Sequence, residues 1–430
     1  MNDDERSGRA DRPELGPIRE RWTDERAPLE RAEQPGKRVS RAVKARVVFI
    51  LTLLLVGLGA PAAHAYPWMI RHGLAECGGC HVDPMGGETL TQMGRALGEA
   101  LLRTPWGDDA PEPTRFLFTV DPPEDVRLGG SVRVLGLTSL DTGRRRVFPM
   151  QADLTGASSF GQLTLAGSLG VSRASRRYEH SSNARLWGDV AAEEVILVSR
   201  NHWLGYRPND DWLLRLGRIN LPFGIRAPEH TLWVRSETRT DRESDQQHGV
   251  AAYYSRGPLR AELMGVLGNF QRPGDAWRER GYTGQFEVLI EPELALGASS
   301  QILVAQRDAE IDEGTVLRQA HGVTLRYVAI PAAVFLIEGD VLSKTGSSLG
   351  YVGMTTLDLE PARGLHLAGT GEVLDRGKPA SGAGLGRGKP HFGGWLTLDW
   401  FFAPHLELRV DAVLRQNRSG VLLTQIHLSL

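Results

Sequence analysis

Large apolar side chains occupy every second position in many segments between residues 126 and 430, and this alternation constrains the fold more than any other feature. In residues 163–169 the side chains of Leu163, Leu165 and Leu169 alternate with small or polar ones. In residues 406–414 apolar side chains alternate with charged ones. Because neighbouring side chains of a β-strand point to opposite faces, the period of two predicts a long, strand-rich region.

The expected strands are about 9 to 12 residues long and number about 16, with no amphipathic helix between them. They cover residues 126–140, 147–157, 162–172, 191–203, 211–219, 247–255, 258–268, 282–290, 293–306, 318–329, 332–343, 348–357, 364–374, 391–401, 404–414 and 421–430. A soluble sandwich alternates in the same way, but the number and length of these segments favour a membrane barrel. We predict a mainly β fold, a transmembrane antiparallel β-barrel of about 16 strands, whose size leaves an aqueous lumen.

Aromatic residues near the segment ends fit the girdles of a membrane barrel, although each of them alone also fits ordinary packing. They are Trp187, Trp203, Trp212, Trp395, Trp400 and Phe401. The longest connection, residues 220–248, is dense in charges of both signs. Two interpretations of this connection stay open: a loop that folds into the lumen and constricts it, or a solvated surface loop.

An export signal precedes the strand region. The apolar run Val47–Ala60 follows a basic flank and precedes an A-x-A site that ends at Ala65. These three features are typical of a secretory signal peptide, and the run is shorter than the roughly 20 apolar residues that a membrane-spanning helix needs. We expect cleavage before Tyr66, and we assign residues 1–65 to a charged N-terminal extension plus signal peptide.

The stretch Cys77-Gly78-Gly79-Cys80-His81 reads C-x-x-C-H and contains the 2 cysteines of the chain. This spacing is the attachment signature of a c-type haem. The thiols of Cys77 and Cys80 would hold one haem c through thioether bonds, and His81 would be an axial ligand of the iron. A redox disulfide is an alternative for an exported C-x-x-C pair. A zinc site would need further ligands, and the sequence has no second cysteine pair.

Residues 66–113 form a short haem segment around this motif. Apolar residues at helical spacing, after a Thr and a Gln that mark a helix start, predict an α-helix that covers one face of the haem. The apolar residues are Leu90, Met93, Leu97 and Leu101, and the start signal is Thr89 with Gln92. Since so short a segment cannot build a large core, the haem would supply much of the buried apolar surface. A linker, residues 114–125, leads to the barrel at 126–430.

The second axial ligand of the iron stays unassigned. Met93, Met69 and His72 are candidates by residue type, because Met/His and bis-His ligation are common. Met93 fits the apolar stripe of the helix better as a core residue. An open iron position, or a ligand from elsewhere in the chain, is equally compatible with the sequence.

Two resemblances follow from these motifs. Residues 66–99, with the C-G-G-C-H motif and the Gly86-Gly87 turn, resemble a short single-haem c-type cytochrome segment. The strand region resembles Gram-negative outer-membrane porins, and Gly217–Gly224 is similar to their G-x-x-x-x-P-F-G element. Together they imply a fused porin–cytochrome in the outer membrane, with the haem segment on the periplasmic side or in the lumen. The chain ends in Leu430, whereas such barrels usually end in an aromatic residue.

The first functional hypothesis is electron transfer across or at the outer membrane. One haem cannot bridge an apolar band of about 25 Å, so a periplasmic donor and an extracellular acceptor, or further cytochromes, are expected partners. The second hypothesis is a diffusion porin for anions or small solutes, in which the haem segment is a structural, sensing or gating element. A haem enzyme is a weaker third hypothesis, and we expect no enzyme.

The net charge of -2 predicts no nucleic-acid partner, and a homo-oligomer is compatible with the sequence.

Overall fold

The computed structural model describes residues 66–87, 89–105, 125–173, 185–187, 195–229, 231–242, 244–269, 278–308, 314–378, 388–416, 418 and 420–429. The expected extension and signal peptide, and all of the expected linker except Asp125, lie outside these residues. Among the helices described, none is both long and apolar enough to cross a membrane.

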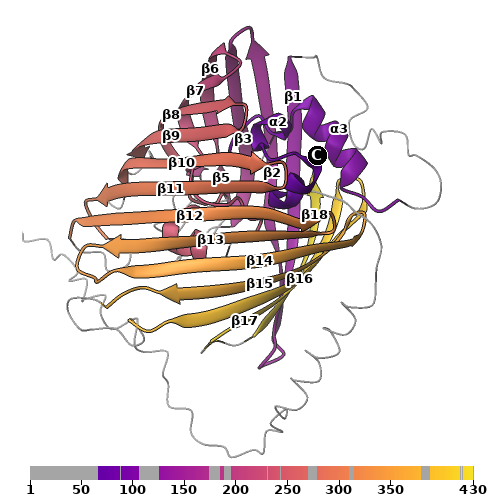
Figure 1. The fold of residues 1–430 in the computed structure, drawn as a ribbon, viewed down its shortest axis with the longest axis vertical. Helices are drawn as coiled ribbons and strands as arrows, with labels where there is room; N and C mark the ends of the chain where they lie inside the picture. The colour runs from indigo at the N-terminus through magenta and orange to yellow at the C-terminus, as the bar shows by residue number, and fades with distance from the viewer. Residues whose placement is uncertain are drawn as a thin grey trace, which may run out of the picture. The chain divides into compact units, whose positions relative to one another are not determined.

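The strands of the described chain join in one antiparallel sheet (Figure 1). They are β1 (Val126–Ser139), β2 (Arg145–Phe160), β3 (Leu163–Arg173), β4 (Arg185–Trp187), β5 (Val195–Val198), β6 (His202–Asn209), β7 (Trp212–Ile219), β8 (Gln247–Arg256), β9 (Leu259–Gly268), β10 (Arg280–Glu291), β11 (Leu294–Ala305), β12 (Val316–Ile330), β13 (Ala333–Lys344), β14 (Gly350–Ala362), β15 (Leu365–Asp375), β16 (His391–Ala403), β17 (Leu406–Arg415) and β18 (Val421–Ser429). β1 pairs with β2 on one side and with β18 on the other, and this pairing closes the sheet into a barrel.

The eighteen strands fill sixteen strand positions in the barrel wall. β5 and β6 pair with successive parts of β3 and together make one wall strand, while β4 pairs with β5. The remaining strands pair in chain order, as in an antiparallel meander. Of the predicted fold class, the closed antiparallel barrel of about 16 strands is confirmed.

The predicted strand boundaries agree with the structure to within a few residues almost everywhere. The exception is the expected strand 191–203, which is interrupted between β5 and β6. There the hydroxyl of Ser168 accepts hydrogen bonds from the backbone amides of Arg200 at 2.9 Å and Asn201 at 3.0 Å. A side chain thus replaces the backbone partner that regular pairing would supply, an effect that residue periodicity does not reveal.

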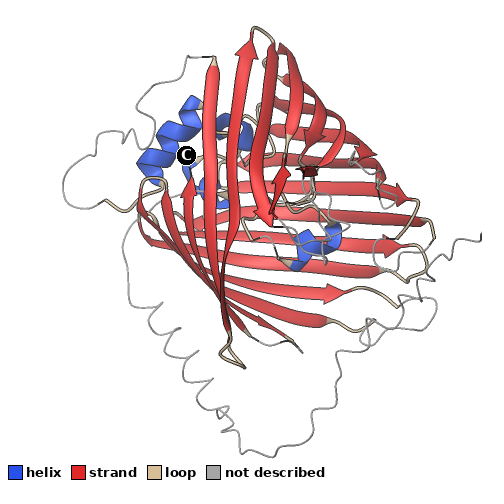
Figure 2. Cartoon of the chain, turned by 180° about the vertical axis from the view of Figure 1, so that it is seen from behind, coloured by secondary structure: helices blue, strands red, loops and turns tan. Residues whose placement is uncertain are grey.

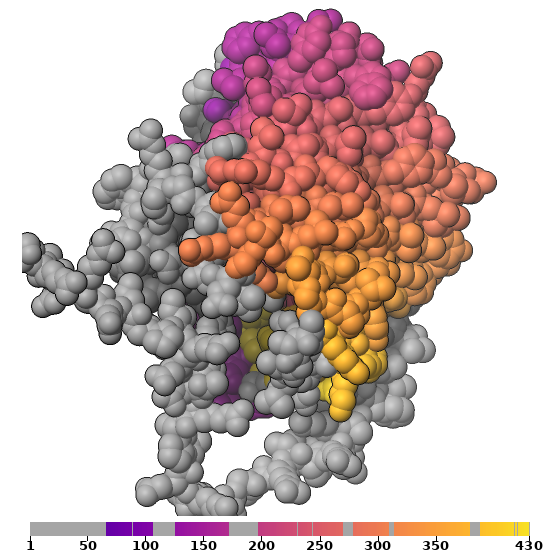
Figure 3. Space-filling view, turned by 90° about the vertical axis from the view of Figure 1, so that its left-hand side faces the viewer, coloured from indigo at the N-terminus to yellow at the C-terminus, as the bar shows by residue number. Residues whose placement is uncertain are grey.

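The outer face of the barrel carries many exposed apolar side chains. On the side that Figure 3 shows, the segments from β6 to β15 follow one another in chain order from magenta to yellow. In β7, Leu214 and Leu216 are exposed while Leu213 and Arg215 are buried. Of the expected girdle residues, Trp212 is exposed as a girdle requires.

For three of the expected girdle residues the interpretation is wrong, because Trp203, Trp395 and Phe401 are buried. Trp203 and Trp395 belong to clusters of buried apolar side chains, and Phe401 stacks on Tyr66 with ring centroids 5.8 Å apart. Trp400 is half-buried, and the side chain of Trp187 lies outside the described residues.

The interior of the barrel is only partly the aqueous lumen that sixteen strands predict. A cluster of buried apolar side chains joins three parts of the chain: residues 66–75, residues 225–234 and the inner faces of strands from β11 to β17. Its members are Trp68, Ile70, Ala75, Ile225, Ala227, Leu232, Trp233, Val234, Ala295, Val328, Val334, Leu336, Val352, Met354, Leu374, Trp395 and Val413. Two segments outside the strands are therefore packed against the inner wall.

Four short helical elements lie in residues 66–105 and in the connection between β7 and β8. Figure 2 draws the helices in blue. They are η2 (Pro67–His72), α2 (Cys77–Cys80), α3 (Gln92–Leu101) and α4 (Trp233–Thr238). The helix predicted from the apolar stripe is present as α3, but it starts at a different residue. Thr91, and not Thr89, is its N-cap, and the Thr91 side chain accepts from the amide of Gly94 at 3.0 Å. The core placement of Met93 is wrong, because 50% of this side chain is exposed.

Candidate functional site

The C-x-x-C-H motif forms one helical turn, α2, that is fastened to α3. The amide of His81 donates to the carbonyl of Cys77 at 2.8 Å and closes the turn. Thr91 binds the same turn twice, through its amide to Cys80 at 2.9 Å and through its hydroxyl to Gly79 at 2.8 Å. A Cβ atom on Gly94 would lie 2.0 Å from the Cys80 carbonyl oxygen, so α3 can pack here only with glycine at this position.

The imidazole of His81 is held in one tautomer. Its Nδ1 lies 3.0 Å from the carbonyl oxygen of Gly87. Since a carbonyl oxygen only accepts, Nδ1 carries the proton and Nε2 keeps a free lone pair. Burial, and next the charge of Arg242, lower the pKa of His81 to about 4. The ring is therefore neutral at pH 7, with the tautomer and second-shell hydrogen bond that are typical of a metal-binding histidine.

The two thiols are free and are not joined in a disulfide. Burial raises the pKa of the thiols of both Cys77 and Cys80. Gly86, with a φ of +80°, passes close to Cys77, and a Cβ atom there would lie 3.6 Å from its sulfur. In the described ranges, no group of three or more His, Cys, Asp or Glu side chains could hold a metal ion such as the zinc of the alternative interpretation.

A cavity of about 280 Å³ lies inside the barrel beside this motif. Both thiols and His81 line it, together with apolar side chains of the haem segment and polar side chains of the inner wall. The apolar group includes Met69, Leu74, Met85, Leu90 and Leu102, and the inner wall and its loops contribute Arg133, Gln151, Asp153, Arg200, Arg226, Arg242, Tyr253, Arg260, Glu262, Glu287, Arg326 and His427. The cavity is thus apolar near the motif and charged toward the wall.

The candidate axial ligands differ in their relation to this cavity. Met69 lines it, whereas neither Met93 nor His72 is among its lining residues. Met85, which the sequence interpretation missed, also lines the cavity. Met85 belongs to the tight turn that reaches Gly86, beside Cys77 and His81. These methionines lie close together in the sequence, so residue type alone cannot decide which of them is the better candidate ligand.

Buried polar contacts anchor residues 66–105, the described part of the predicted haem segment, to the barrel wall. Asp83 pairs with Arg215 of β7 at 2.9 Å and accepts from Asn220 at 3.1 Å. Arg71 pairs with Asp358 and Glu360 of β14, and the Glu360 contact measures 3.1 Å. These pairs are fully or nearly fully buried, so the segment is part of the barrel interior and not an appended domain.

The haem segment lies at the end of the barrel that carries the short connections. The amide of Thr104 donates to the carbonyl of Phe401 at 2.7 Å, next to the β16–β17 turn. Glu99 lies 3.3 Å from His405 in that turn. The long connections, among them residues 220–246, leave the strands at the opposite end.

The charged connection 220–246 enters the lumen, which decides between the two interpretations of the sequence. Its backbone amides bind inward side chains of the wall: Gly224 to Ser299 at 2.9 Å, Ile225 to Glu338 at 2.7 Å and Trp233 to Glu372 at 2.6 Å. Arg235 of α4 also pairs with Glu338. We call residues 220–246 the constriction loop.

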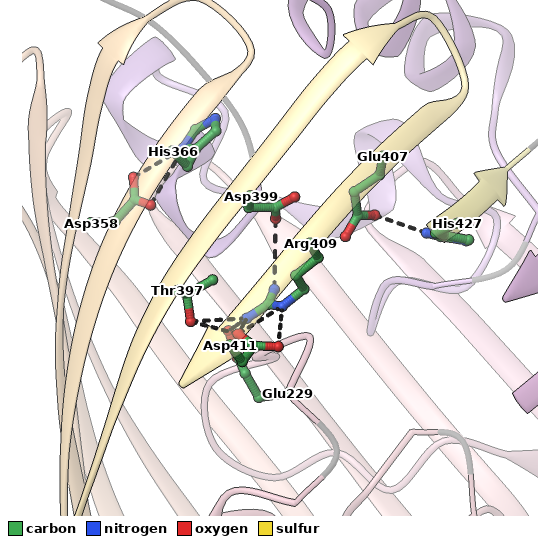
Figure 4. Close-up of polar contacts among 9 residues, drawn as sticks. All are labelled: Glu229, Asp358, His366, Thr397, Asp399, Glu407, Arg409, Asp411 and His427. Carbon is green, nitrogen blue, oxygen red and sulfur yellow. Dashed lines mark hydrogen bonds and ion pairs between the residues drawn. The ribbon is translucent and has the colours of Figure 1, made fainter. Parts of the chain in front are cut away.

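A network of polar and ionisable side chains ties the constriction loop to the wall (Figure 4). Arg409 of β17 donates to Glu229 of the loop at 2.5 Å and to Asp411 at 3.0 Å, and it lies 3.6 Å from Asp399. Thr397 donates to Asp411 at 2.7 Å. The loop is therefore held by charge pairs as well as by apolar packing.

Two histidine–carboxylate pairs flank this network (Figure 4). His366 lies 3.3 Å from Asp358, the carboxylate that also binds Arg71. His427 lies 2.8 Å from Glu407 and lines the cavity beside the motif. Polar contacts thus continue along the inner wall from the anchor of the haem segment to the constriction loop.

No family model matches the chain, and no curated protein matches it. Solved structures of outer-membrane barrels do match. A loop L8 deletion mutant of OmpT from Vibrio cholerae is 13% identical with a TM-score of 0.52, over 71% of this chain and 99% of that one. The trimer form of in-vitro folded OmpT is 12% identical with a TM-score of 0.52, over 71% and 99%. OmpF of Salmonella typhi in complex with daunomycin is 11% identical with a TM-score of 0.54, over 72% and 100%. Identities this low show the fold alone, a porin-like barrel.

Proposed function

We propose that this chain is an outer-membrane barrel that carries one covalent haem c inside its short-turn end and supports electron transfer at that membrane. The observation that carries the proposal is the arrangement of the C-x-x-C-H motif. Both thiols and the neutral His81 line one cavity, and the hydrogen bond to Gly87 leaves Nε2 available for iron.

The residues present fit a haem better than they fit the alternatives. Cys77 and Cys80 would tether the group, His81 would ligate it, and the apolar side of the cavity would cover the macrocycle. A bound haem would supply a one-electron couple. A redox dithiol needs an accessible thiolate with a lowered pKa, whereas burial raises the pKa of these thiols.

Met69 would be the second residue that holds the haem iron, through its thioether sulfur. Among the three ligand candidates from the sequence, it lines the cavity, while Met93 and His72 do not. Met85 also lines the cavity, but it precedes Gly86, which lies beside Cys77 and His81. The anchors of Arg71 and Asp83 would hold both ligands in a fixed position relative to the wall.

The location in the membrane follows from the surface and the topology. The apolar outer face suits lipid, and short connections face the periplasm in outer-membrane barrels. The haem would then receive electrons from a periplasmic donor and pass them to an extracellular acceptor or to further cytochromes. We propose no enzymatic turnover. A homo-oligomer is compatible with the proposal, and one of the similar structures is a trimer form.

A second candidate function is a diffusion porin in which the haem segment is a structural or gating element. The charged inner wall favours it, since arginine side chains suit small anions. The filling of the interior by the haem segment and the constriction loop argues against free passage of larger solutes.

Proteoliposomes that enclose a reductant test the two functions. If the protein transfers electrons, the enclosed reductant should change the haem absorbance to the spectrum of the reduced form. Addition of a ferric acceptor outside should restore the spectrum of the oxidised form. A Cys77→Ala/Cys80→Ala variant should show neither change. Ion conductance that is the same in this variant, without haem reduction in the wild type, would favour the plain porin. A purified barrel without covalent haem would overturn both haem-based functions.

A further inference from the structure

The arginines that line the cavity differ in how their charge is balanced. Arg200 lies 2.7 Å from Asp153, and Arg326 pairs with Glu287 at 2.5 Å. Arg260 lies 3.8 Å from both Glu287 and Glu76. For these side chains the wall itself supplies a carboxylate.

Arg226 of the constriction loop is different. Within the described chain its side chain donates to two backbone carbonyl oxygens, those of Leu221 and of Thr240 at 3.4 Å, and pairs with no carboxylate. Its Nε atom is buried and makes no hydrogen bond there. Burial, and next the charge of Arg235, lower the pKa of Arg226 to about 10, so it is still charged at pH 7.

The acids nearest to Arg226 bind another arginine. Asp83 and Glu262 both pair with Arg215. Arg226 and Cys77 both line the cavity. The Arg226 guanidinium thus lines the space beside the attachment motif with no ion pair of its own in the described chain, and a buried charge without an ion pair is costly.

We propose that Arg226 is a carboxylate receptor, occupied by a haem propionate, so that insertion of the haem fixes the constriction loop across the lumen. A guanidinium binds a carboxylate with two parallel hydrogen bonds, and each haem carries two propionates. The inference rests on the proposed haem attachment. A free small carboxylate has the same chemistry, and the experiment below separates the two sources.

The consequence is a barrel whose conductance depends on its haem. Arg226 lies in the loop next to Ile225, whose amide is bound to Glu338, and three residues before Glu229, which is bound to Arg409. A haem carboxylate would add a third attachment to the same stretch of loop. Loss of that attachment would free this stretch of the loop to move away from the wall. A neutral residue in place of Arg226 would in addition remove a positive charge from the neighbourhood of the iron.

The test compares Arg226→Gln and Arg226→Lys with the control Arg207→Gln, whose side chain is exposed on β6. Haem content should be unchanged, since Cys77 and Cys80 hold the haem. Arg226→Gln should lower the midpoint potential, because a nearby positive charge disfavours the ferric state, and should raise the conductance in planar bilayers. Arg226→Lys keeps the positive charge, so its midpoint potential should stay close to that of the wild type. It should raise the conductance less than Arg226→Gln does. Arg207→Gln should change neither.

The same measurements in the Cys77→Ala/Cys80→Ala background complete the test. There Arg226→Gln should no longer raise the conductance, and added acetate should lower it only when Arg226 is present. An equal conductance effect of Arg226→Gln with and without haem would overturn the proposal, as would an unchanged midpoint potential. An acetate effect on the haem-loaded wild type would assign the receptor to a free carboxylate. Absence of haem from the wild type would instead contradict the proposed function, and the acetate titration would still report on Arg226.

Discussion

At the scale of single residues, the site depends on which hydrogen-bonding positions are filled and which stay open. His81 uses one ring nitrogen on Gly87, and this leaves the other for a metal. The sequence alone identifies Cys77, Cys80 and His81 as candidate haem-binding residues, because the C-x-x-C-H spacing is a local pattern. It does not predict Met85 as a lining residue or the exposure of Met93, because both depend on how a turn and a helix pack.

The second axial ligand can be tested with two methionine variants. Met69→Ala should lower the midpoint potential, since a thioether ligand raises it, and should change the absorption spectrum of the ferric haem. Met93→Ala is the matched control, because half of that side chain is exposed and it does not line the cavity. Equal spectra and potentials for Met69→Ala and the wild type would exclude Met69 as the ligand.

Two glycines of α3 offer a test of the packing against the motif. Gly94→Ala would place a Cβ atom 2.0 Å from the Cys80 carbonyl oxygen, so we expect loss of haem attachment and lower thermal stability. A Cβ atom on Gly98 would meet only the side chain of Leu102, at 4.0 Å, which is an ordinary contact, so Gly98→Ala should be neutral or stabilising by up to about 1 kcal/mol. Haem staining and thermal unfolding of both variants measure the difference. Full haem content in Gly94→Ala would contradict the described contact between helix and motif.

At the scale of elements, the strands follow from the sequence and the lumen contents do not. Alternation is a local pattern, and it places almost every strand to within a few residues. The contact of Arg71 with Asp358 joins residues 287 positions apart, and no periodicity encodes such a pairing. The same holds for the constriction loop, whose charge density fitted both a surface loop and a loop inside the lumen.

The anchor of the haem segment should be a strong contributor to stability. Arg71→Ala leaves Asp358 and Glu360 without their buried cation, and we expect a loss of about 3–5 kcal/mol in the free energy of unfolding. Arg256→Ala is the control, because Arg256 pairs with Asp211 at 3.5 Å on the exposed surface, where a pair contributes at most about 1 kcal/mol. Urea unfolding in detergent compares them. Similar losses in both variants would show that the buried pair is not an anchor.

The constriction loop should respond to pH through Asp245. Burial, and next the charge of Asp241, raise the pKa of Asp245 to about 7, against the opposing charges of Arg239 and Arg318. The folded loop therefore binds a proton more tightly than the unfolded one, and its stability falls as pH rises from about 4 to about 7. We expect bilayer conductance to increase over this range in the wild type and to stay constant in Asp245→Asn. The same increase in Asp245→Asn would assign the pH dependence to another group.

At the scale of the whole molecule, a porin-like barrel has been partly filled by two of its own segments. One segment brings the C-x-x-C-H motif into the short-turn end, and the other crosses the lumen and lines the same cavity. A single haem at one end of a barrel could not by itself conduct across a band of about 25 Å, so the proposed electron transfer would need redox partners on both sides. The sequence indicates these parts separately, whereas their meeting in one cavity is a property of the closed barrel.

The central claim is that the barrel carries a covalent haem, and one measurement tests it most directly. The purified outer-membrane protein is denatured, separated by electrophoresis and examined for haem absorbance on the band of the chain. We predict that haem remains on the wild-type band and is lost from Cys77→Ala/Cys80→Ala, while the Arg207→Gln control keeps it. A wild-type barrel whose denatured chain carries no haem would contradict the account.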